Sequence, residues 1–211
     1  MGKRPDGSLP PWAYVVWWPY LLGLSLKLHL KISQPREEPL MDEVQGGLWV
    51  SGWPRSAAVL PAGKAGVAVI DVTCELPRRH AVGPYLNLPA WDTDCASVSD
   101  IQRGVEFALE AMAAGHAVVV HCAHGHGRSA QVAAAVLLAK GLALSPRDAE
   151  KYMQRTRPRV RLNARQHSGL GEWVAWSVRA RGGVAARPQG GGWLEHGPPA
   201  ASVTARGGSH A

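Results

Sequence analysis

The alternation of short apolar runs with longer amphipathic segments predicts an α/β fold. Four short runs, rich in valine, isoleucine or aromatic residues, have the character of strands: 48–51, 67–72, 85–88 and 117–120. Apolar residues recur at helical spacing in four longer segments: 99–115, 129–140, 146–155 and 163–179. Strands that alternate with helices favour a central, largely parallel sheet flanked by helices. Ligands of such sheets bind at the carboxyl ends of strands, which directs attention to the residues just after 120.

Composition divides the 211 residues into three parts. Residues 1–42 form an apolar N-terminal extension that ends in a linker with prolines and charges, and we expect the folded domain to occupy residues 43–181. Residues 182–211 contain eight glycines and three prolines, a content typical of disordered chains. We therefore expect one globular domain with an extension at each end.

The N-terminal extension contains an uncharged apolar stretch from Trp12 to Leu26. Its 15 residues fall short of the roughly 20 that a spanning helix requires, and no small-residue cleavage site follows it. Residues 12–32 could lie on a membrane surface, pack against the domain, or span a bilayer. Trp17, Trp18 and Tyr20 would suit the headgroup region of a membrane.

The formal charge of +7 favours anionic partners such as phosphorylated substrates, nucleic acid or an acidic membrane face. Charge alone does not choose among them. Arginines gather between Arg155 and Arg165, and they either rim the approach to an active site or form a solvated face. They lack the interleaved aromatic residues that a single-strand nucleic-acid platform uses, so we do not expect a nucleic-acid partner.

Cysteine usage indicates a reducing, intracellular compartment. The three cysteines, Cys74, Cys95 and Cys122, have no metal-ligand spacing, and an odd number does not fit a disulfide framework. The protein would then be cytoplasmic or associated with a membrane. Cys95 is either an ordinary thiol or a disulfide partner for Cys122 after oxidation.

The strongest chemical signal is the segment 121–129, which reads His-Cys-Ala-His-Gly-His-Gly-Arg-Ser and lies between a buried strand and a helix. Backbone N–H groups of a tight loop before a helix form a nest for an anion, and glycine permits close approach of a phosphate. A thiol that faces such donors ionises easily, so Cys122 is the candidate nucleophile. The expected phosphate-binding residues are Ala123, His124, Gly125, His126, Gly127 and Arg128.

Other residues of this segment have expected supporting roles. The planar guanidinium of Arg128 can bind two phosphate oxygens and stabilise charge during phosphoryl transfer. Ser129 can donate a hydrogen bond to the departing sulfur, or it simply caps the next helix. His121 is expected to hold the loop from beneath. The other two histidines could add positive charge beside an anionic substrate or point to solvent. Without matching carboxylates, the three histidines do not predict a metal site.

The segment resembles the signature His-Cys-x-x-Gly-x-Gly-Arg-Ser of the protein tyrosine phosphatase superfamily, and the short domain is similar to its dual-specificity branch. Four further segments look like a small plant-type group of that branch: 17–20 (WWPY), 52–54 (GWP), 71–77 (DVTCELP) and 91–93 (WDT). The resemblance implies a phosphatase that forms a phosphocysteine intermediate and needs no metal or other cofactor. Its substrates would be phosphotyrosine and phosphoserine or phosphothreonine proteins, or phosphoinositides and other phospholipids.

The resemblance also implies a general acid on a separate loop. Asp92 follows a predicted strand and matches the acid of the family by its position beside Trp91. Asp94 is the second candidate, and Asp100 fits better as an acid in the first turn of a helix. The family often holds an asparagine that braces the phosphate loop, so Asn163 has either that role or the role of a helix cap.

Two other classes of function remain open on the sequence. A sulfurtransferase or an arsenate reductase also places a cysteine in an anion-binding loop. A phosphate-binding module without turnover would be expected to lack the cysteine, the arginine or the acid, and all three are present here. The ending Gly-x-Gly-Arg-Ser fits phosphoryl transfer best.

Overall fold

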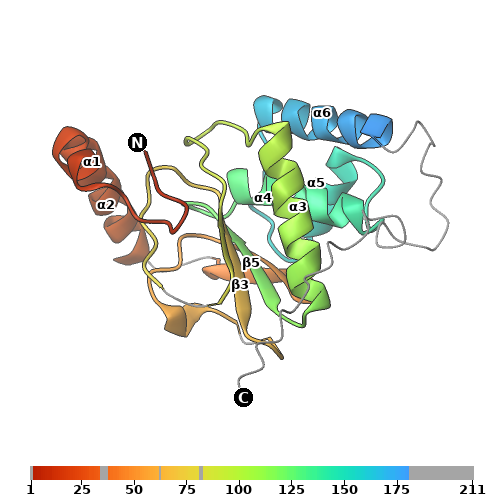
Figure 1. The fold of residues 1–211 in the computed structure, drawn as a ribbon, viewed down its shortest axis with the longest axis horizontal. Coiled ribbons are helices and arrows are strands. Elements are labelled where there is room, and N and C mark those ends of the chain that lie inside the picture. Colours follow the sequence, from red (N-terminus) through yellow and green to blue (C-terminus); the bar gives the residue numbers. More distant parts are fainter. Residues whose placement is uncertain (1, 34–37, 62, 81–82, 181–211) are drawn as a thin grey trace, which may run out of the picture.

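A five-stranded, mostly parallel sheet forms the centre of the protein. The computed structural model describes residues 2–33, 38–61, 63–80 and 83–180 (Figure 1). The strands are β1 (Met41–Gln45), β2 (Leu48–Ser51), β3 (Val67–Asp71), β4 (Tyr85–Asn87) and β5 (Ala117–His121). They lie in the order β1, β2, β5, β3, β4, and only the β1–β2 pair within the described residues is antiparallel. The fold class predicted from the sequence is confirmed.

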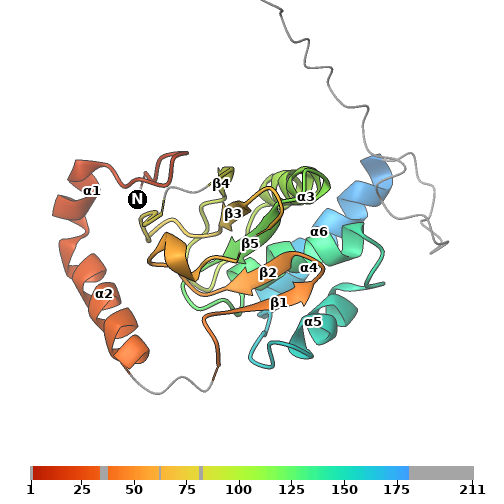
Figure 2. The same cartoon turned by 90° about the horizontal axis from the view of Figure 1, so that it is seen from below.

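Four helices lie on one face of the sheet and enclose the main core; two of them pack on the strands, and the other two pack against those helices (Figure 2). They are α3 (Val98–Ala113), α4 (Arg128–Ala139), α5 (Pro146–Gln154) and α6 (Ala164–Ala180). Ile70 and Val120 of the central strands belong to this core, together with α4, which is buried along its whole length. Val69 and Val119 point to the other face, because successive strand residues alternate in direction, and they form a smaller cluster there with Trp49. The central strands are therefore buried on both faces, as parallel strands usually are.

The hydrophobic pattern does not predict strand β1. It carries Asp42 and Glu43, and its pairing with β2 has an irregularity between Glu43 and Gln45, so its alternation is obscured. As an edge strand it tolerates these charges. The sheet consequently begins at Met41, slightly before the domain start that composition suggests.

The helix α3 begins two residues earlier than its expected cap implies. Ser97, and not Ser99, caps it: the Oγ of Ser97 accepts a hydrogen bond from the amide of Asp100 at 3.1 Å. Both serines precede the apolar pattern, and the pattern alone does not distinguish them. A short 3₁₀ helix (Ala57–Val59) follows β2.

Two helices form an N-terminal arm, α1 (Pro11–Val16) and α2 (Trp18–Ser33), which lies beside the domain at the opposite end from α6 (Figures 1 and 2). Pro19 stands in the first turn of α2, where a missing N–H costs nothing, so it opens the helix and does not break it. Within the described residues, no helix combines the length and the apolarity that crossing a membrane requires. The tail predicted to be disordered, 182–211, and the linker positions 34–37 lie outside the described residues.

Candidate active site

The segment 121–129 connects the central strand to the N-terminus of a buried helix. β5 ends at His121 and α4 begins at Arg128. We call residues 122–128 the signature loop. Because β5 lies between β2 and β3, the loop sits at the carboxyl edge of the middle of the sheet, where α/β proteins bind ligands.

The backbone of the signature loop turns its N–H groups inward. The carbonyls of the five residues from 123 to 127 each accept a hydrogen bond from outside the loop. The donors are the amide of Trp53 (3.2 Å), Nη2 and Nε of Arg157 (3.1 and 2.9 Å), and the amides of Arg161 (2.9 Å) and Gln131 (2.8 Å). Across a planar trans peptide, the carbonyl and the next N–H point in opposite directions. The amides of residues 124–128 therefore face the interior of the loop, as a nest for an anion requires.

Gly125 is required by the tight course of this loop. Its φ is +77°, and a Cβ at this position would lie 2.5 Å from the carbonyl carbon of Ser51 and 2.6 Å from the nitrogen of Gly52. Both are backbone atoms of the segment that follows β2 and cannot move aside easily. Any side chain would therefore push the loop away from the sheet.

Cys122 is only 4% exposed, and its sulfur lies among hydrogen-bond donors. The amide of Gly125 and the hydroxyl of Ser129 donate to it at 3.2 and 3.3 Å. Burial alone would raise the pKa of this thiol, but the charge of Arg128 and these hydrogen bonds outweigh burial, so the pKa of Cys122 lies below its ordinary value. Burial raises the pKa of the other two thiols, that of Cys74 to about 12. The loop thus favours the thiolate at Cys122.

The guanidinium of Arg128 is held by Glu75, a residue for which the sequence suggested no role. Nη1 and Nη2 of Arg128 donate to the two carboxylate oxygens of Glu75 at 3.0 and 2.8 Å, and both side chains are almost fully buried. Nη1 also donates to the carbonyl of Ala90 at 2.8 Å. Burial opposes the charge of Arg128, but the hydrogen bonds and charge of Glu75 raise its pKa. This bidentate pair fixes the plane of the guanidinium. The available signal was an acidic residue shortly after a fully buried strand.

Among the three candidate acids, Asp92 is the one placed against Arg128. Its Oδ1 accepts from Nη2 at 3.1 Å, and its side chain remains 54% exposed. Asp94 instead faces Arg165 at 3.7 Å. Asp100 lies in the first turn of α3, where the helix dipole favours a negative charge. The geometry therefore separates Asp92 from the other two.

Asn163 binds the loop that carries Asp92 rather than the signature loop. We call residues 91–95 the acid loop. The Nδ2 of Asn163 donates to the carbonyl of Thr93 at 2.7 Å, while Asn163 and Gln166 exchange two hydrogen bonds of 2.9 and 3.0 Å between side chain and backbone at the start of α6. Gln166 is the residue that reaches the signature loop, because a Cβ on Gly127 would lie 3.0 Å from its side chain. Asn163 is thus a helix cap that also holds the acid loop.

Arg157 braces the signature loop from behind, and it is neither a rim residue nor part of a solvated face. Besides binding two loop carbonyls, it is buried and donates from Nη1 to Asp42 at 2.6 Å. The other arginines of 155–165 are exposed. Because arginines recur at every second position from 155 to 161, the sequence does not show which one is buried. The Nε2 of His126 lies 2.6 Å from Glu38, a carboxylate outside the loop, so this ring does not simply point to solvent. Across the described ranges, no group of three or more His, Cys, Asp or Glu side chains is placed to hold a metal ion.

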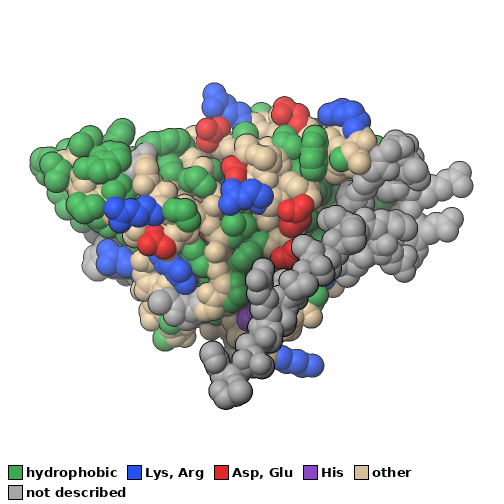
Figure 3. Space-filling model, in the orientation of Figure 1, with side chains coloured by type: hydrophobic (Ala, Val, Ile, Leu, Met, Phe, Trp, Pro, Cys, Tyr) green, Lys and Arg blue, Asp and Glu red, His purple; other side chains and the backbone are tan. Residues whose placement is uncertain are grey.

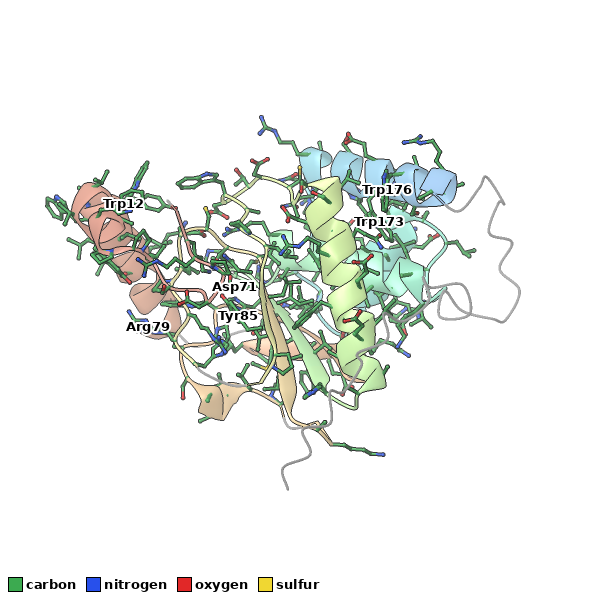
Figure 4. The ribbon with its side chains drawn as sticks, viewed as in Figure 1. Trp12, Asp71, Arg79, Tyr85, Trp173 and Trp176 are labelled. Carbon is green, nitrogen blue, oxygen red and sulfur yellow. The ribbon has the colours of Figure 1, made fainter. Side chains whose placement is uncertain are left out.

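Beneath the loop lies a buried charged cluster that includes a residue from the start of the chain. The Nε2 of His121 lies 3.5 Å from Oδ2 of Asp71, and Lys3 donates to the same oxygen at 2.5 Å. Tyr85 donates to Asp71 at 2.7 Å (Figure 4). Lys3 also donates to the carbonyl of Thr73 at 3.1 Å. Burial would raise the pKa of Asp71, but the neighbouring His121 and Lys3 lower it overall, while burial lowers the pKa of His121. The buried contact with Asp71 suits a positioning role for His121.

The comparison with known families agrees with this arrangement. Residues 50–175 match the dual specificity phosphatase catalytic domain. The chain belongs to this family. The match contains both the acid loop and the signature loop, whereas the N-terminal arm lies outside it. A comparison with curated proteins finds no match.

Solved structures similar to this chain include phosphatases and a phosphatase-like protein. PTPMT1 in complex with PI(5)P is 22% identical, with 67% of this chain and 99% of that chain covered and a TM-score of 0.55. Tk-PTP in its active form is 27% identical, with 64% and 96% covered and a TM-score of 0.55. Human tyrosine phosphatase-like serine/threonine/tyrosine-interacting protein is 24% identical, with 68% and 99% covered and a TM-score of 0.54. The assignment to a plant-type group within the branch stays a prediction.

Proposed function

We propose that this protein hydrolyses phosphate monoesters through a phosphocysteine intermediate on Cys122. The observation that carries the proposal is a buried thiol with a lowered pKa inside a loop of inward-facing amides, next to a fixed guanidinium. Phosphoryl transfer to a thiol requires these groups: an ionised nucleophile, hydrogen-bond donors for the phosphate oxygens, and positive charge.

In the first step the thiolate of Cys122 attacks phosphorus, the S–P bond forms, and the bond to the leaving oxygen breaks as Asp92 donates a proton to it. The signature-loop amides and Arg128 hold the other three oxygens. In the second step water attacks phosphorus, Asp92 takes a proton from that water, and the S–P bond breaks while Ser129 donates to the departing sulfur. The products are an alcohol or phenol and inorganic phosphate, and no cofactor takes part.

The contact between Asp92 and Arg128 has a consequence for substrate binding. Asp92 accepts from Nη2 of Arg128 at 3.1 Å, which is one of the donors proposed for phosphate. A bound phosphate would compete for this donor and release Asp92 toward the leaving oxygen. Because Asp92 is the half-exposed member of the contact, its movement does not disturb the buried pair with Glu75.

The substrate classes to compare are phosphotyrosine proteins, phosphoserine and phosphothreonine proteins, and phosphoinositides or other lipid phosphates. The likeness of the fold to PTPMT1, whose structure contains PI(5)P, supports including phosphoinositides. Exposed arginines adjoin the signature loop, since the amide of Arg161 binds the carbonyl of His126. Positive charge there favours anionic substrates of each class.

Turnover of p-nitrophenyl phosphate tests the proposed activity. The wild-type protein should release phosphate, Cys122→Ser should not, and Cys95→Ser should behave as the wild type because Cys95 has no proposed role in the chemistry. A wild type that binds inorganic phosphate without releasing any from the ester would favour a non-catalytic phosphate-binding module. Sulfur transfer or arsenate reduction in place of ester hydrolysis would favour the other thiol chemistries.

A further inference from the structure

The N-terminal arm presents an apolar surface to solvent. Eight of its large hydrophobic residues are exposed, from 39% at Tyr20 to 73% at Val15. We call this set the arm surface: Trp12, Tyr14, Val15, Val16, Trp18, Tyr20, Leu22 and Leu26. Figure 3 shows hydrophobic side chains gathered at the end of the molecule where α1 and α2 lie. Contiguous exposed apolar surface of this kind marks a site of interaction with a membrane or a partner.

The arm surface continues to the acid loop. The rings of Trp17 and Tyr20 lie 5.9 and 6.4 Å from the ring of Trp91. Trp91 is itself exposed and directly precedes Asp92. Apolar residues therefore border the candidate active site on the side of its proposed acid.

The segment before α1 is bound to the domain, so the arm has a defined orientation. The buried ion pair of Lys3 with Asp71 anchors the segment before α1. Close by, Asn87 donates to the carbonyl of Arg4 at 3.2 Å, and the amide of Arg78 donates to the carbonyl of Gly7 at 2.9 Å. Whatever binds the arm surface is thus held in a fixed position relative to the signature loop.

The charge of residues 7–33 and the length of α2 favour the surface of a lipid bilayer as the binding partner of the arm surface. Residues 7–33 contain Lys27 and Lys31 but no aspartate or glutamate, which complements an anionic surface. Half of the arm surface is Trp or Tyr, the residues that prefer the headgroup region. The 16 residues of α2 extend about 24 Å, less than the roughly 30 Å of hydrocarbon in a bilayer. We infer that the arm surface docks the protein onto an anionic membrane, with the acid loop at the level of the headgroups.

The effect of docking on catalysis rests on the proposed function. A phosphate monoester in the membrane surface would reach the signature loop without leaving the bilayer. A phosphorylated headgroup in vesicles should therefore be turned over faster than the same headgroup on a soluble short-chain lipid. Both forms share the reacting phosphate, so the comparison isolates the contribution of docking.

Sedimentation with phosphatidylcholine vesicles, with and without phosphatidylserine, tests docking independently of turnover. The full chain with Val15→Ser, Trp18→Ser and Leu22→Ser should bind anionic vesicles at least about tenfold more weakly, because three side chains can no longer insert. Leu144→Ser is the matched control, since Leu144 is 74% exposed but lies outside the arm. It should bind as the wild type does. All three proteins should hydrolyse a soluble aryl phosphate equally, which also shows that they are folded.

Unchanged vesicle binding by the triple variant, or an equal loss in Leu144→Ser, would overturn the docking site. So would a wild type that ignores anionic vesicles and forms dimers that the triple substitution dissociates, because the arm surface would then meet a second copy of the chain. Vesicle binding as predicted, with no hydrolysis of aryl phosphate by any of the proteins, would support docking and refute the proposed function.

Discussion

The replacement of Glu75 by glutamine removes a buried negative charge and keeps the size of the side chain. In the structure both oxygens of Glu75 accept from Arg128, and Oε2 also accepts from the amide of Cys74 at 3.1 Å. A glutamine can accept from one nitrogen of Arg128, but its NH₂ group then faces the other, so a donor opposes a donor. The guanidinium would stay buried with half of its partner.

The expected cost follows from the burial of this pair. Removing one partner of a buried ion pair costs about 3–5 kcal/mol, and we expect a loss of about 3 kcal/mol because glutamine keeps one acceptor. For a protein of this size each kcal/mol lowers Tm by about 2–4 °C, so Tm should fall by about 6–12 °C. A displaced Arg128 should also lower kcat/KM for an aryl phosphate by about 100-fold.

Calorimetric melting and steady-state kinetics at neutral pH measure both effects of Glu75→Gln. Glu110→Gln is the matched control, because Glu110 lies exposed on α3. The control should melt and turn over as the wild type does. Glu75→Gln with the Tm and kcat/KM of the wild type would refute the view that this carboxylate positions Arg128.

Three further predictions concern the chemistry of the candidate site. Arg128→Lys should keep the fold, measured by circular dichroism, but lose most turnover, because a point charge cannot make the bidentate contact. Asp92→Asn should slow hydrolysis of alkyl phosphates far more than of phenyl phosphates, since a phenol of pKa about 10 is the better leaving group; equal losses would reject Asp92 as the acid. The lowered pKa of Cys122 predicts alkylation by iodoacetamide at a lower pH than an ordinary thiol requires, falling as the pH drops through that pKa, whereas Cys95, with a raised pKa, should require a higher pH than an ordinary thiol. Peptide-resolved mass spectrometry measures both, and a profile of Cys122 that Ser129→Ala does not move to higher pH would argue against the hydrogen bond to sulfur.

The signature loop could be predicted because its chemistry is local. Cys122, Arg128 and Ser129 lie within eight residues, where a valine-rich strand leads through a loop into a helix, so residue type and spacing describe the nest almost completely. The sheet was predictable for a similar reason, since β3 and β5 are unbroken apolar runs. The edge strand β1 could not be predicted, because its charged residues and irregular pairing obscure the alternation of apolar and polar positions.

The support of the loop could not be predicted, because it depends on contacts between distant parts of the chain. Glu75 and Arg128 are 53 residues apart, and Lys3 and Asp71 are 68 apart. A buried charge and a solvated charge look alike in a sequence when the partner is far away. Arg157 illustrates the same limit, since only tertiary packing separates it from the exposed arginines beside it.

The most direct measurement is the detection of phosphate bound covalently to Cys122. The protein mixed with an aryl phosphate, quenched in acid and digested, should yield one phosphate on the peptide that contains Cys122, as measured by mass spectrometry. The proposed mechanism predicts that this phosphopeptide is absent, together with turnover, in Cys122→Ser. Turnover that persists in Cys122→Ser, with no phosphate on this peptide in the wild type, would contradict the mechanism.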